Sequence, residues 1–213
     1  ARRASNVPRV DFNTGHYGWL RVFNRSTIQD AQIGIANTTD HLSTANAGGI
    51  ISCTASNLID NGQGVFLIPV KKYNNCSIIT DNQFSFTKTY NYPYLSGSLT
   101  QQIGMVAVLT RFSNNLQNNR FVNTTNNNII DLGTGYVLLS CRANIGGSGL
   151  YDGITEFSNL FKGIDAYNLW ALEDQIKVHD NDFEQVHKGV SLNNGVFSGV
   201  FNNSFANIQN GDN

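Results

Sequence analysis

Short apolar runs separated by turn-forming residues recur throughout this chain and restrict it to β structure. Trp19 to Phe23, Ile50 to Ala55 and Phe84 to Tyr90 are runs of this kind. In the last of them apolar and polar residues alternate, as in a strand with one buried face. Roughly eight such runs follow one another at a spacing of about ten residues, a rhythm that predicts stacked β-sheets.

The composition argues against a mainly helical protein. The chain of 213 residues contains 30 Asn and 20 Gly but only three Glu. Asn and Gly favour turns, whereas Glu favours helices. We therefore expect an all-β fold, a β-sandwich of jelly-roll or Greek-key type.

One region departs from this rhythm and predicts a short helical excursion around residues 154–178. Its apolar residues recur at the spacing of a helix face, at Phe157, Leu160, Phe161 and Ile164. The second half of the region also fits the two-residue period of a strand, and that choice stays open.

Two Asn-Gly pairs predict β-hairpins, at Asn61-Gly62 and Asn194-Gly195. The run from Ile103 to Phe112 is apolar on both faces, which favours a central strand. Residues 113–128 contain eight Asn and predict a polar loop. We see no internal repeat, and we expect a single β-rich domain over residues 13–213, preceded by an arm, residues 1–12.

The charge of the chain offers no overall attraction for a polyanion. The net charge is −1, and the basic cluster lies in the arm, at Arg2, Arg3 and Arg9. These arginines are candidates for an interface or for nucleic-acid contact, although a solvated or partner-bound arm is the favoured interpretation. The sequence contains no apolar run of membrane-spanning length.

Candidate ligand-binding residues are few. Asp180, Asp182 and Glu184 supply oxygen atoms for a weak calcium site, but the segment lacks the glycine and glutamate of an EF-hand, and a solvated acidic turn is favoured. Beyond calcium we expect no cofactor. Four tyrosines in predicted loops are candidates for stacking on a ligand or for an interface, with coverage of the sandwich ends as the favoured alternative: Tyr90, Tyr92, Tyr94 and Tyr151.

No catalytic constellation is evident, and we do not expect an enzyme. Asp131, Asp152 and Asp165 are available for a glycosidase pair, but nothing in their spacing selects them. The three cysteines are widely spaced and match no zinc or redox motif. Three buried free thiols are the favoured state, and one disulfide with one free thiol is the alternative.

In composition and strand rhythm the chain resembles jelly-roll coat subunits. This resemblance implies a virion structural protein, such as a capsid, minor capsid or tail-associated subunit, that is made in the host cytoplasm. Its partners are then copies of itself, other particle proteins and nucleic acid at the arm. The alternative is a secreted, extracellular carbohydrate-binding or adhesin module, and a polysaccharide hydrolase ranks third.

Overall fold

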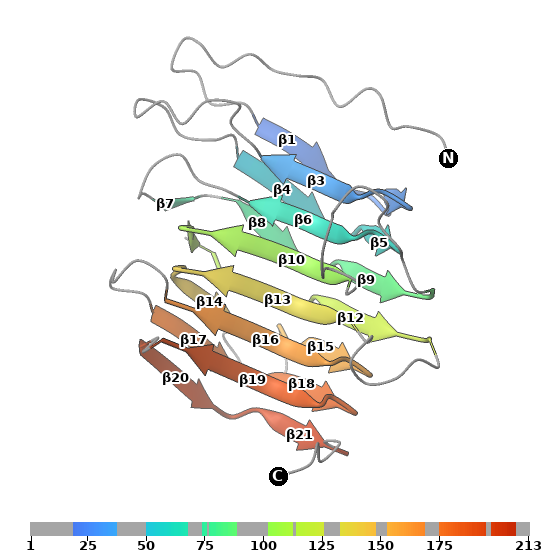
Figure 1. Cartoon of the computed structure of the whole chain (residues 1–213). Helices are drawn as coiled ribbons and strands as arrows, with labels where there is room; N and C mark the ends of the chain where they lie inside the picture. Colours follow the sequence, from blue (N-terminus) through green and yellow to red (C-terminus); the bar gives the residue numbers. More distant parts are fainter. Residues whose placement is uncertain are drawn as a thin grey trace.

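Every regular element that the structure describes is a strand, and every pair of strands is parallel. The computed structural model describes residues 19–37, 50–67, 74–75, 77–88, 102–112, 114–125, 133–147, 153–168, 175–194 and 197–207. Figure 1 shows the strands stacked in parallel rows from the N-terminal to the C-terminal end of the molecule. The described residues contain no helix and no antiparallel ladder.

The strands form three walls. The six-stranded wall consists of β3 (Ile33–Asn37), β6 (Gln63–Leu67), β10 (Ile103–Val108), β13 (Thr134–Leu139), β16 (Lys162–Tyr167) and β19 (Lys188–Asn193). The seven-stranded wall consists of β2 (Thr27–Gln29), β5 (Asn57–Ile59), β9 (Gln83–Phe86), β12 (Arg120–Asn123), β15 (Thr155–Ser158), β18 (Asn181–Glu184) and β21 (Ser204–Ala206).

The third wall has two parts. Its strands are β1 (Trp19–Val22), β4 (Ile50–Thr54) and β8 (Ile78–Thr80), followed by β14 (Ala143–Ile145), β17 (Gln175–His179) and β20 (Phe197–Phe201). Residues 116 and 117 connect the parts, because Gln117 accepts a hydrogen bond from the Asp81 amide and Leu116 bridges to Ile145. Beside this wall, β7 (Asn74–Asn75) pairs with β11 (Arg111–Phe112).

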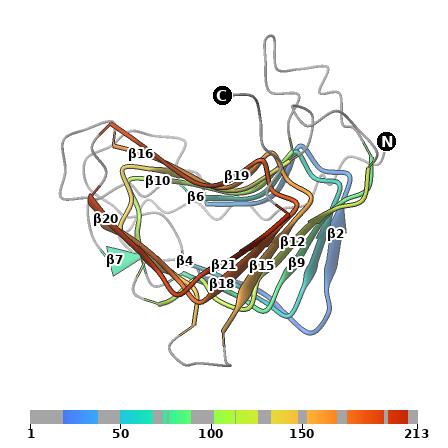
Figure 2. The same cartoon turned by 90° about the horizontal axis from the view of Figure 1, so that it is seen from below.

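The chain visits the walls in a fixed order, so the fold is a parallel β-solenoid. Each turn runs from the third wall to the seven-stranded wall and then to the six-stranded wall, and each strand pairs with its counterpart in the next turn. We call these turns rungs 1 to 7; rung 1 is β1–β2–β3 and rung 7 is β20–β21. Figure 2, seen along the stack, shows the strands superimposed around one interior.

The expected jelly-roll sandwich is therefore wrong, and so are the two hairpins. At Asn61-Gly62 the chain turns a corner from β5 into β6, which lie in different walls and do not pair with each other. The Asn61 amide is buried and bonds to the preceding rung, donating to the Ile28 carbonyl at 2.8 Å and accepting from the Ala31 amide at 3.0 Å. Likewise β19 pairs with β16 and β20 with β17, not with each other.

The helical excursion around residues 154–178 is also wrong. The described part of this region forms β15, β16 and most of β17. Asn159 adopts φ 53° and turns the chain between β15 and β16, so that Phe157 and Ile164 both point inward from different walls. The helix-like spacing of the apolar residues from Phe157 to Ile164 therefore results from a corner between two strands. Residues 169–174 lie outside the described residues.

A row of phenylalanines runs along the inside of the seven-stranded wall. Phe84, Phe121, Phe157, Phe183 and Phe205 occupy equivalent positions on successive rungs. Neighbouring rings stack with centroids 4.5 to 5.2 Å apart, for example 4.7 Å between Phe157 and Phe183. Four of these five rings are fully buried, so the row forms the centre of the core.

A matching row of glycines faces the rings from the six-stranded wall. A Cβ atom on Gly135 would lie 2.6 Å from the Gly163 carbonyl oxygen and 2.7 Å from the Phe157 ring. Gly64, Gly104, Gly163 and Gly189 meet Phe84, Phe121, Phe183 and Phe205 in the same way. The two walls approach this closely because the facing position carries no side chain.

Asparagines explain how the corners are held. At the corner between the third and seven-stranded walls, Asp81, Asn118, Asp180 and Asn202 adopt positive φ, and each precedes an asparagine. The amides of these asparagines donate to carbonyls of the preceding rung: Asn82 to Cys53, Asn119 to Ile79, Asn181 to Ile145 and Asn203 to Val178. Two of these residues, Asn118 and Asn119, belong to the predicted Asn-rich loop, which instead contains a corner and β12.

The close approach of the two walls predicts a position-dependent cost of adding one methyl group. We expect Gly135→Ala to lower the free energy of unfolding by about 1–3 kcal/mol, because backbone and ring must both shift. Gly199→Ala is the matched control, since a Cβ there meets no atom of the described residues closer than 3.7 Å. Urea unfolding of both variants measures the difference, and equal stabilities would contradict the packing.

Candidate functional site

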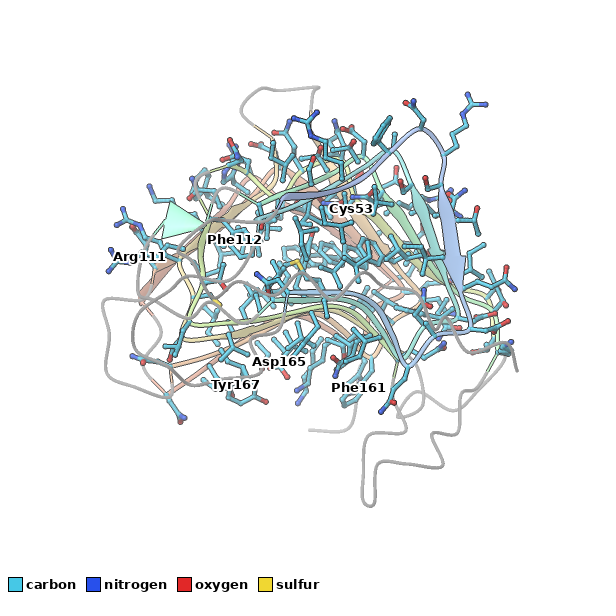
Figure 3. All side chains as sticks on the ribbon, turned by 90° about the horizontal axis from the view of Figure 1, so that it is seen from above. Cys53, Arg111, Phe112, Phe161, Asp165 and Tyr167 are labelled. Carbon is cyan, nitrogen blue, oxygen red and sulfur yellow. The ribbon has the colours of Figure 1, made fainter. Side chains whose placement is uncertain are left out.

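The outer face of the six-stranded wall carries a connected polar cluster centred on β16 and β19. In β16, Ile164 and Ala166 point into the core, whereas Asp165 and Tyr167 point away from it. Figure 3 shows Phe161, Asp165 and Tyr167 on the outer side of this wall, with Cys53 between the walls. Because side chains alternate along a strand, β16 contributes apolar residues to the core and polar residues to the outer face.

Asp165 is the centre of this cluster. Its Oδ2 accepts hydrogen bonds from Lys162 Nζ at 2.6 Å and from the Tyr167 hydroxyl at 3.0 Å. Its Oδ1 accepts from Asn193 Nδ2 at 3.1 Å, and Asn193 also donates to Ser191 Oγ at 3.2 Å. We call Lys162, Asp165, Tyr167, Ser191 and Asn193 the Asp165 cluster.

The cluster is preorganised by its own hydrogen bonds. The Asp165 side chain is 9% exposed and the Lys162 side chain 17%, so the ion pair is largely shielded from water. Burial, and then the hydrogen bond to Asp165, raise the pKa of Tyr167. The tyrosine therefore stays a neutral hydroxyl at physiological pH, and the cluster presents amide, hydroxyl and ammonium groups in fixed positions.

An aromatic pair lies beside the cluster. Phe161 and His187 come from adjacent rungs and stack with ring centroids 5.2 Å apart. Lys162 Nζ lies 5.6 Å from the Phe161 ring centroid. Lys188, the register partner of Lys162, is exposed, and among the described residues no carboxylate pairs with it. His187 Nδ1 is buried without a hydrogen-bond partner in the described part of the chain.

The outer face changes from apolar to polar along the solenoid. One outward row reads Phe66, Val106, Val137, Asp165, Ser191 from rung 2 to rung 6. The neighbouring row reads Val108, Leu139, Tyr167, Asn193. The Asp165 cluster thus lies where an apolar strip ends, an arrangement suited to a ligand with both apolar faces and hydroxyl groups.

Most of the residues predicted from sequence lie elsewhere. Arg2, Arg3 and Arg9, with the whole arm, and Tyr90, Tyr92, Tyr94 and Tyr151 lie outside the described residues, as do Asp131 and Asp152. Their proposed roles stay predictions. Asp165 is described, but on a strand rather than in or near a loop.

The three candidate calcium ligands are separated by the pleat and the corner. Asp180 is the corner residue and its carboxylate contacts His179 Nδ1 at 2.9 Å. Asp182 and Glu184 are exposed on the outer face of the seven-stranded wall. Within the described residues, no group of three His, Cys, Asp or Glu side chains is placed to hold a metal ion. A calcium site therefore has no geometric support from these residues.

The cysteines in the described segments are buried thiols. Cys53 and Cys141 are both buried and form no disulfide, and Cys76 lies outside the described residues. Burial raises the pKa of Cys53 to about 12. The thiol is therefore unreactive at neutral pH and serves as a small core residue.

Comparison with known proteins gave no match: no family model, curated protein or solved structure is significantly similar to this chain. The described residues include no apolar helix long enough to cross a bilayer. Any function is therefore argued from the residues of this chain.

The Asp165 cluster escaped the sequence analysis, although a signal for it was present. A bulky apolar residue is followed six positions later by glycine at Ile28, Leu58, Phe157 and Phe183. Two and four residues after these glycines come the outward positions, which are Asp165 and Tyr167 in rung 5 and Ser191 and Asn193 in rung 6. The expectation of no internal repeat was therefore wrong. Insertions in rungs 3 and 4 lengthen the spacing between apolar residue and glycine, and they hide the repeat in the sequence.

The contact between Asp165 and Tyr167 predicts a change in tyrosine titration. The pKa of Tyr167 is raised in the folded protein, so the neutral tyrosine stabilises the fold at pH values below the ordinary tyrosine pKa of about 10. This stabilisation is lost as the pH rises through the pKa of Tyr167 in the folded protein. We expect Asp165→Asn to bring the pKa of Tyr167 down toward the ordinary value. Nuclear magnetic resonance of ring-labelled tyrosine, assigned with Tyr167→Phe, measures it; an unchanged titration would contradict the contact.

Proposed function

We propose that this protein is a non-catalytic binding scaffold whose six-stranded wall holds a carbohydrate chain. The observation that carries the proposal is the Asp165 cluster beside the Phe161–His187 ring pair. Sugar hydroxyls match amide, hydroxyl and ammonium groups, and the apolar faces of sugar rings match aromatic side chains. Both kinds of group are present here on two adjacent rungs.

The shape of the wall favours a polymer over a small molecule. Successive rungs repeat at the strand spacing of about 4.8 Å, so a chain lying along the solenoid meets equivalent positions one after another. Such repetition provides a long, shallow surface on which weak contacts add along the ligand.

Binding is better supported than hydrolysis. Among the described strand residues of the six-stranded wall, Asp165 is the single carboxylate, and its oxygens are engaged by Lys162, Tyr167 and Asn193. Glycoside hydrolysis normally requires two carboxylates on either side of the bond. The described wall thus supplies groups for recognition without supplying an acid–base pair.

The interpretation as a virion subunit stays a prediction, and so do its host-cytoplasmic origin and the extracellular alternative. The virion interpretation rested on composition and strand rhythm, and the jelly roll that it implied is absent from the described residues. The Asp165 cluster supports the carbohydrate-binding interpretation instead. We therefore rank the binding role first.

Titration with neutral and uronic-acid oligosaccharides, followed by calorimetry, tests the proposal. We expect Tyr167→Ala and Asn193→Ala each to weaken binding by about tenfold or more, a loss of at least 1.4 kcal/mol. Asn144→Ala is the matched control, because Asn144 is an exposed asparagine on the third wall. Absence of binding to every oligosaccharide, or equal affinity of all variants with unchanged melting temperatures, would contradict the proposal.

A further inference from the structure

The large hydrophobic side chains that are exposed lie at the two ends of the solenoid. Six such residues are exposed among the described segments, and all belong to rung 1 or rung 7. Rung 1 contributes Leu20, Phe23 and Ile33, and rung 7 contributes Val200, Phe201 and Phe205. For three of them the register partner in the neighbouring rung is buried, so their exposure follows from their position in the stack.

Three of these six residues belong to inward-facing rows. Leu20 is the register partner of Ile51, Val200 of Val178 and Phe205 of Phe183, and each of these partners is at most 1% exposed. Leu20, Val200 and Phe205 are 37%, 45% and 48% exposed because the described strands supply no further rung on that side. They belong to core rows that no further described strand continues.

The strands of the end rungs also present unpaired backbone edges. Among the described strands, β20 and β21 pair on one side only, as do β1 and β2 at the other end. An unpaired edge is a template for another strand, and proteins usually protect it with charged residues. The described residues of rung 7, 197–207, contain no charged side chain.

The two ends fit each other. A second copy placed with its rung 1 on rung 7 continues the interior rows, with Ile28 stacking on Phe205 and Val22 on Val200. In this orientation the strands stay parallel, as they are everywhere in the described structure. Joining two identical ends would instead force antiparallel pairing between walls built for parallel register.

We propose that copies of this protein stack head to tail, rung 1 of one copy on rung 7 of the next. The contact is heterologous, so each copy keeps one free end and stacking continues into an open filament. Burial of three inward-facing side chains and pairing of two strand edges drive the association. The inference is independent of the carbohydrate proposal, since the Asp165 cluster lies on an outer face.

Complementation between two end variants tests the order of stacking. We expect the unmodified protein to form filaments, seen by electron microscopy and by light scattering after size-exclusion chromatography. Phe205→Asp blocks the rung 7 end and Leu20→Asp the rung 1 end, so each variant alone is monomeric. Mixed together, they form a one-to-one dimer, because each retains the end that the other lacks.

A control and three outcomes make the test decisive. Ser158→Asp places the same charge on the outer face of the seven-stranded wall in rung 5, and filaments persist. Dimers formed by Leu20→Asp alone would show rung 7 meeting rung 7 and overturn the head-to-tail order. An unmodified protein that stays monomeric at high concentration would show that other parts of the chain cover the ends. Filaments that persist in both end variants would place the contact elsewhere, and each of these outcomes overturns the proposal.

Discussion

The stacking of phenylalanine rings against a row of glycines is the interaction on which the rest of this structure depends. Phe121, Phe157 and Phe183 stack on one another at 4.7 and 5.2 Å, and the facing Gly104, Gly135 and Gly163 leave no room for a side chain. Because rings and glycines repeat with the rungs, this contact fixes the vertical register of both walls. The outward side chains of successive strands are aligned in the same register, which places Asp165 next to Ser191.

The sequence predicted local structure correctly where one strand was sufficient to explain the pattern. The strand predicted at Ile50 to Ala55 is confirmed as β4, and the run from Ile103 to Phe112 contains β10 and β11. The strand predicted at Phe84 to Tyr90 is confirmed only as far as Phe86, and residues 89–90 lie outside the described residues. What failed was the partner of each strand, since alternation does not record whether the chain reverses or turns a corner. Asn61-Gly62 carried a hairpin signal, yet the Asn61 side chain is buried as a bridge between rungs.

The candidate site was less predictable than the individual strands, for a physical reason. Asp165 of β16 contacts Asn193 of β19, 28 residues later in the sequence. The two residues become neighbours only because their strands stack in parallel. The antiparallel sandwich expected from the sequence gives no reason to select Asp165 over the other carboxylates. The same stacking that creates the polar cluster also leaves core residues exposed in the first and last described rungs, so the proposed ligand binding and the proposed self-association both rest on one architecture.

Distances between spin labels along one outer row test the parallel solenoid most directly. Thr27, Gln83, Glu156 and Ser204 occupy one outward row, on rungs 1, 3, 5 and 7. A label at Thr27 should lie roughly 10 Å from one at Gln83, 19 Å from one at Glu156 and 29 Å from one at Ser204, because these pairs are two, four and six strand spacings apart. Distances that rise in this order support the account; distances that rise and then fall, as in sheets folded back on each other, would contradict it.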